Sequence, residues 1–89
     1  MMRKVVRSRT GKTLEVVLEV EGGKISRLTI SGDFMAFPSR AIDELERALV
    51  GKKAGEVEGV VKKILKNVEL IGVEVDEIIE TIRELASSR

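Results

Sequence analysis

The stretch ISGDFMAFPSRAIDELERALVG, from Ile30 to Gly51, contains the change from strand to helix that decides the fold. The chain leaves an expected strand through Gly32-Asp33-Phe34 and enters an amphipathic helix expected at residues 39–50, with Pro38 in its first turn. Gly51 directly follows this helix, at the position where a left-handed glycine commonly ends one. The stretch therefore separates a β part of the chain from a helical part.

The residues before this stretch predict an antiparallel sheet. Strands are expected at residues 4–9, 13–20 and 24–31. The second strand alternates apolar and polar side chains, which indicates a sheet covered on one face only. Gly22-Gly23 supplies the two positive-φ positions of a tight hairpin turn. In the third strand Ile25 breaks the alternation set by Leu28 and Ile30, which indicates a bulge or a late strand start.

The residues after the stretch predict two more amphipathic helices, at residues 55–67 and 75–87. Gly59 lies inside the first of them, where we expect close packing against a neighbouring element. Three one-sided helices need a common surface, and the apolar face of a three-stranded antiparallel β-meander supplies one. The predicted fold is a two-layer α+β sandwich. It forms a single domain of residues 1–89, with a sheet part at 4–32, a loop at 32–38 and a helical part at 39–87.

The composition favours a binding module over a free-standing enzyme. A chain of 89 residues buries a thin core, from which a large cleft is difficult to form. The absence of cysteine and histidine excludes disulfides, thiolate catalysis and the usual zinc ligands. Acidic residues on the helices are expected on their solvated faces, so we expect no metal site and no catalytic residue. Abundant Glu, Lys, Arg, Val and Ile are typical of a thermophile.

Charge is balanced overall, at +1, but uneven along the chain. Basic residues precede the first acidic one, Glu15: they are Arg3, Lys4, Arg7, Arg9 and Lys12. They indicate either a solvated edge strand or a surface that faces an anionic ligand or an acidic partner. A broad basic face is lacking, which argues against nucleic acid. No apolar run is long enough to span a bilayer, and no signal peptide is present, so we expect a cytoplasmic protein without a membrane partner.

The loop at residues 32–38 is the candidate site. Gly32 permits an unusual backbone turn, and Asp33 is placed to accept hydrogen bonds from nearby amides, in the manner of an Asx turn. Phe34 and Phe37 are the only aromatic residues of the chain. Either ring fills the corner between sheet and helix, or at least one forms with Met35 an apolar contact surface for a partner.

These elements together resemble the C-terminal accessory domain of lipoate–protein ligases. That family has a hairpin followed by Gly-Asp-Phe-Phe, then a proline, a helix containing Leu-Glu and a Leu-x-Gly end. The matching residues here are Gly32, Asp33, Phe34, Pro38, Leu45, Glu46, Leu49 and Gly51, followed by Ile71-Gly72-Val73 and Asp76. The similarity covers about residues 4 to 86, and Met35 replaces the usual second phenylalanine.

The resemblance implies an accessory subunit of a lipoate–protein ligase, without catalytic residues of its own. It implies a heterodimer with a catalytic subunit that holds ATP, Mg²⁺ and lipoate, none of which this chain would bind alone. The small subunit would assist formation of lipoyl-adenylate and meet lipoyl-acceptor domains indirectly. In several archaea a similar domain is a separate small subunit instead of part of the catalytic chain. A chain that begins at its own methionine would fit that two-chain arrangement. Basic residues that would face the phosphates are Arg7, Arg9, Lys12 and Lys24, and the interface would be formed by Gly32, Asp33, Phe34, Met35, Phe37 and Pro38.

Two alternatives stay open at this point. The strand–strand–helix order is also similar to iron–sulfur scaffold proteins, which carry cysteines at a comparable corner. Because this chain has none, it would be a cysteine-free interaction module that binds another enzyme. Exposed apolar residues intended for a partner also predict that the chain alone forms a homodimer.

Overall fold

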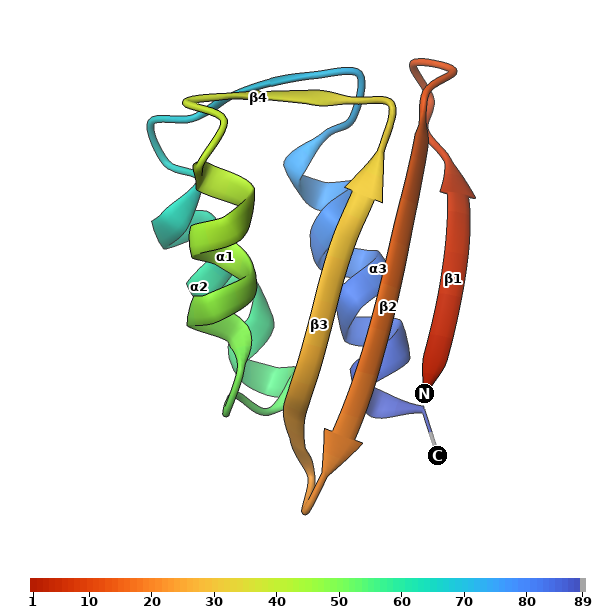
Figure 1. Cartoon of the computed structure of the whole chain (residues 1–89), viewed down its shortest axis with the longest axis vertical. Coiled ribbons are helices and arrows are strands. Elements are labelled where there is room, and N and C mark those ends of the chain that lie inside the picture. The colour runs from red at the N-terminus through yellow and green to blue at the C-terminus, as the bar shows by residue number, and fades with distance from the viewer. Residues whose placement is uncertain (89) are drawn as a thin grey trace.

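The computed structural model describes residues 1–88 and consists of a β layer and a helical layer (Figure 1). The strands are β1 (Met2–Arg7), β2 (Thr13–Glu21), β3 (Lys24–Gly32), β4 (Met35–Phe37) and β5 (Glu69–Ile71). The helices are α1 (Ala41–Leu49), the 3₁₀ turn η1 (Ala54–Glu56), α2 (Val57–Ile64) and α3 (Val75–Ser87). β1, β2 and β3 form an antiparallel sheet in that order, which confirms the predicted meander and the α+β class.

The first strand begins and ends earlier than the sequence pattern predicts. It covers Met2–Arg7 instead of residues 4–9. Ser8 has already left the strand, because its N–H bonds to the carbonyl of Lys12 at 2.7 Å and its own carbonyl accepts from Gly11 N–H at 2.9 Å. The turn between β1 and β2 therefore covers Ser8 to Lys12.

The second hairpin has the turn and the bulge that the sequence predicts. Gly22 and Gly23 adopt φ values of +59° and +79°. Glu19 lies opposite Arg27, but Val20 lies opposite Ile25, so β3 contains one extra residue, Ser26. The bulge returns Ile25 to the buried side of the sheet, where it is 1% exposed.

One face of the sheet packs against α1 and α3, α2 packs against these two helices, and the core lies between the sheet and the helices (Figure 1). The side chains that are fully excluded from solvent come from both layers: Leu14, Val16 and Leu18 of β2, Ala41, Leu45 and Leu49 of α1, Val57 and Val61 of α2, and Ile78 and Ile82 of α3. Burial of an aliphatic side chain contributes about 1.5–3 kcal/mol, so these contacts dominate the stability. No helix in the described chain is both long and apolar enough to cross a membrane.

The helical part departs from prediction in three places. α1 covers Ala41–Leu49 instead of residues 39–50, so Pro38 precedes the helix. The second helix was expected at residues 55–67, but α2 ends at Ile64, because the chain turns toward β5. Gly59 does not pack closely: a Cβ built there would meet nothing within 4 Å. The expectation of a close neighbour at Gly59 is wrong, since this residue lies on the exposed side of α2. By contrast, α3 covers Val75–Ser87 as predicted.

β4 and β5 were not anticipated as strands. They form a two-stranded antiparallel sheet, here called the ribbon, in which Met35 lies opposite Ile71 and Phe37 opposite Glu69. β4 runs across one end of the molecule, from the end of β3 to the start of α1 (Figure 1). The segment at 32–38, expected as a loop, is therefore a corner followed by an ordered strand.

Candidate functional site

The corner at Gly32-Asp33 is fixed to β2 by backbone geometry and by one carboxylate. Gly32 has φ +153°, and an added Cβ would lie 2.2 Å from the carbonyl oxygen of Thr13. Asp33 Oδ1 accepts the Thr13 N–H at 2.6 Å and the Thr13 hydroxyl at 3.1 Å. The backbone hydrogen bond from Thr13 is the main cause of a lowered pKa of Asp33. Asp33 does accept an amide hydrogen bond, but the donor lies on the neighbouring strand instead of in a local Asx turn.

A second tie joins the turn between β1 and β2 to the end of the ribbon. The Thr10 hydroxyl donates to the carbonyl of Gly72, directly after β5. Gly72 has φ +100°, and a Cβ there would lie 2.8 Å from Cγ of Lys12. The stem of Lys12 therefore packs over Gly72, so a side chain at this position would have to displace Lys12 and would also be strained by the positive φ. Both strands of the ribbon are thus held by the first hairpin.

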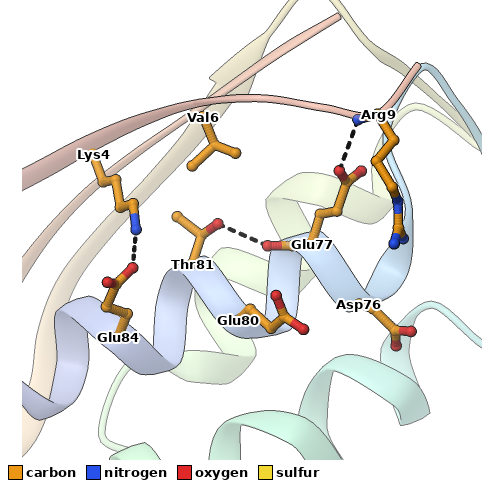
Figure 2. Close-up of a pocket in the computed structure, with 8 residues that line it drawn as sticks. All are labelled: Lys4, Val6, Arg9, Asp76, Glu77, Glu80, Thr81 and Glu84. Atoms are coloured by element: carbon orange, nitrogen blue, oxygen red, sulfur yellow. Dashed lines mark hydrogen bonds and ion pairs between the residues drawn. The ribbon is translucent and has the colours of Figure 1, made fainter. Parts of the chain in front are cut away.

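The start of α3 is bonded to the same turn through Glu77 (Figure 2). Glu77 Oε1 accepts the Ser8 hydroxyl at 2.6 Å and the Glu74 N–H at 2.9 Å, and Glu77 Oε2 accepts the Arg9 N–H at 3.0 Å. Glu77 therefore caps its own helix and also binds the β1–β2 turn. The guanidinium of Arg9 pairs with Glu74, so it is already neutralised within the chain.

The hollow between β1 and α3 in Figure 2 has a volume of about 340 Å³. Charged side chains line most of it: Lys4, Arg9, Asp76, Glu77, Glu80 and Glu84. Lys4 pairs with Glu84 across it. Within residues 1–88 no group of three or more acidic side chains is arranged to hold a metal ion. The geometry indicates internal charge pairing between strand and helix more than a binding cavity.

The ribbon has one buried and one exposed side. Ala36 is 8% exposed and Leu70 packs against the core, so these two residues form the inner side. The outer side has Met35 (54% exposed), Phe37 (45%) and Ile71 (46%), here called the apolar ribbon face, together with the exposed Glu69 opposite Phe37. A solvated β face is normally polar, so three large apolar side chains there require an explanation.

The two aromatic residues have different environments. Phe34 is partly buried and packs against the core cluster, as the corner-filling interpretation expects. Phe37 is displayed with Met35 on the apolar ribbon face. A shallow hollow of about 350 Å³ adjoins both Phe34 and Phe37 and is lined mainly by residues of β3, β4 and the start of α1. Pro38 is exposed at the end of β4.

The four basic candidates do not form one cluster. Arg7, Arg9 and Lys12 lie at or near the β1–β2 turn, at the ribbon end of the molecule, whereas Lys24 follows the β2–β3 turn at the opposite end (Figure 1). Arg9 is paired with Glu74. Within the described part of the chain, Arg7 and Lys12 form no ion pair.

Sequence reasoning missed Ile71 and Thr13 as structural members of this region. Ile71 was seen as part of a motif, but a three-residue strand gives too little alternation to show that it faces outward. The role of Thr13 depends on a bond to a residue 20 positions away, which no local pattern contains.

The fold and this surface define a small α+β domain with an ordered, exposed apolar face at one end. The family described as the bacterial lipoate protein ligase C-terminus matches residues 2–82, and the chain belongs to this family. This match favours the ligase domain over the iron–sulfur-scaffold-like module.

Individual relatives agree. The chain is 31% identical over 71 residues to lipoate-protein ligase A subunit 2 of Thermoplasma acidophilum, which covers 79% of this chain and 76% of that protein. It is also similar to a chain in a structure of a bi-partite lipoate protein ligase and its E2 lipoyl domain from the same archaeon. There the TM-score is 0.78 at 26% identity, and the match covers 91% of this chain and 97% of the other.

Proposed function

We propose that this chain is the accessory subunit of a two-chain lipoate–protein ligase and assists the ATP-dependent activation of lipoate to lipoyl-adenylate. The observation that carries the proposal is the match over most of both chains to a second ligase subunit and to a bi-partite ligase. A catalytic subunit would hold lipoate, ATP and Mg²⁺ as substrates and metal, and this chain would bind to it as a heterodimer in the cytoplasm.

The proposed contribution is positional. An ordered domain that closes over an adenylation site excludes water from the reactive mixed anhydride and fixes carboxylate and triphosphate in register. Lys12 and Arg7 are the basic side chains best placed to add positive charge near phosphates from the ribbon end. Lys24 would serve only a partner at the opposite end. Acceptor domains would then meet the catalytic subunit, with this chain acting indirectly.

Reconstitution tests the proposal. The catalytic subunit from the same genome is mixed with lipoate, ATP, Mg²⁺ and an apo lipoyl domain, with and without this chain, and the mass of the acceptor is followed. We expect modification only when both chains are present. Equal modification by the catalytic subunit alone would overturn the accessory role.

A second measurement locates the step. With purified lipoyl-adenylate supplied in place of lipoate and ATP, the catalytic subunit should transfer the lipoyl group without this chain. If transfer from the adenylate also requires this chain, its role is not confined to activation. Calorimetry of the chain alone with Mg-ATP should show no binding in the micromolar range.

A further inference from the structure

We propose that the apolar ribbon face, formed by Met35, Phe37 and Ile71, is the surface that the catalytic subunit covers. This inference rests on the proposed function and adds to it the location of the interface and a residue, Ile71, that lies 36 positions after Met35 in the chain. The pairing of Met35 with Ile71 brings the two side chains to one side of the ribbon.

The two solvent-facing β surfaces of the molecule differ in chemistry. On the open face of the main sheet, Arg3 pairs with Glu15 and Arg27 lies 3.9 Å from Glu19, so the exposed Val5 is surrounded by charged side chains there. On the outer face of the ribbon, three of the four side chains are apolar (Met35, Phe37 and Ile71), and only Glu69, opposite Phe37, is charged. In the free chain this apolar surface is exposed to water. Its removal from water by another surface lowers the free energy and favours association.

The ribbon is also held in place before any partner arrives. Asp33 bonds its entry to Thr13, and Thr10 bonds the residue after β5. These hydrogen bonds lie beside the apolar ribbon face and do not involve its side chains, so a partner that covers this face breaks none of them. An ordered surface loses little conformational entropy on binding, which favours association.

The exposed area of the apolar ribbon face argues for a partner other than a second copy of this chain. The three side chains are about half exposed. At about 200 Å² each they offer on the order of 300 Å² in total. A stable interface needs about 800 Å² from each partner. A symmetric contact through this strip alone is too small, whereas a larger subunit can also contact the adjoining hollow and the β1–β2 turn.

The test measures binding of the purified catalytic subunit to this chain by calorimetry. Two variants alter the strip: the double variant Met35→Thr/Ile71→Thr and the single variant Phe37→Ser. Two matched controls alter equally exposed apolar residues elsewhere: Val50→Thr (46% exposed), just after α1 at the other end of that helix, and Val5→Thr (54% exposed), on the main sheet. Thermal unfolding of each variant confirms that it is folded.

We expect the strip variants to weaken binding at least tenfold and the controls to change it less than twofold. Equal binding by all variants overturns this inference and leaves the proposed function intact. If the wild-type chain does not bind the catalytic subunit, the proposed function fails first. Loss of binding to an acceptor lipoyl domain instead, or loss of a homodimer in sedimentation without any effect on the catalytic subunit, assigns the strip to that other occupant and overturns the inference.

Discussion

The carboxylate of Glu46 in α1 accepts a hydrogen bond from the backbone N–H of Ile30 in β3, with 2.7 Å between Oε2 and N. β3 is an edge strand of the sheet, so its outward N–H groups have no strand to bond. At the other end of the same edge, Ile25 exchanges hydrogen bonds with Gly51 and Lys52. The edge of β3 is therefore closed by α1 and the turn that follows it. Glu46 belongs to the Leu-Glu pair of the motif, and this bond gives that residue a structural role.

Replacing Glu46 by Ala should destabilise the chain by about 1–2 kcal/mol, because the partly buried Ile30 N–H loses its acceptor. Glu46→Gln keeps an acceptor oxygen and should lose less than half of that. The measurement is chemical denaturation of both variants. Glu44→Ala is the control, since the Glu44 side chain forms only a surface pair among residues 1–88, with Arg40 at 3.5 Å, and its loss should change stability by no more than about 0.5 kcal/mol. Equal effects of the Glu46 and Glu44 variants would contradict the proposed role.

Gly59→Ala should stabilise the chain by roughly 0.5–1 kcal/mol, because alanine is a better helix former and the site is open. For a domain of this size, that corresponds to a rise in Tm of a few degrees in calorimetry. The control is Gly51→Ala. Its surroundings are equally open, but its φ of +89° disfavours a side chain, so it should lower the Tm. If Gly59→Ala is instead less stable than wild type, the open surroundings of Gly59 do not describe the environment of this position, and the expectation is wrong.

The layers of this fold were predictable because their signals are local. Alternation in β2, the Gly22-Gly23 turn and the bulge before Leu28 follow from the period of a strand. α3 was predicted at its exact bounds because its apolar stripe is long. The bounds of β1 differ from the predicted residues 4–9 because the backbone of Ser8 forms hydrogen bonds within the β1–β2 turn. The apolar and polar pattern of the sequence does not show where this turn begins.

The candidate site was less predictable because it is built from distant segments. The corner at Gly32-Asp33 was recognised, but its partner, Thr13, lies on β2. Ile71 joins Met35 only through the pairing of two short strands that are separated by α1 and α2. The basic residues at the start of the chain indicated an anionic partner or a solvated edge. In the structure Arg3, Lys4 and Arg9 have partners within the chain, at Glu15, Glu84 and Glu74.

Asp33→Asn should destabilise the chain at neutral pH and have little effect in acid. The hydrogen bonds from Thr13 lower the pKa of Asp33 in the folded chain below its value in the unfolded chain. Its stabilising contribution is therefore present above the unfolded pKa, near pH 4 for an ordinary aspartate, and is lost as the pH falls through the folded pKa. Denaturation of wild type and variant at several pH values should show two stabilities that converge in acid.

The control for this experiment is Glu21→Gln, at the exposed end of β2, where no side-chain hydrogen bond is present among the described residues. The difference between this variant and wild type should stay small over the same pH range. If Asp33→Asn differs from wild type by the same amount at neutral and acid pH, the carboxylate charge does not stabilise the corner.

Gly32→Ala should be the most damaging of the glycine substitutions at this end of the sheet. The new Cβ would lie 2.2 Å from the carbonyl oxygen of Thr13, a backbone atom that cannot move without breaking the bonds between Thr13 and Asp33. Gly23→Ala supplies the comparison, because its φ of +79° is also unfavourable but its Cβ would meet nothing within 4 Å. Strain alone should cost Gly23→Ala about 1–2 kcal/mol, and the added clash should place Gly32→Ala above that. Equal unfolding midpoints for the two variants would mean that the corner relaxes around the methyl group, and the rigid placement of β4 would then have to come from the Thr10–Gly72 tie.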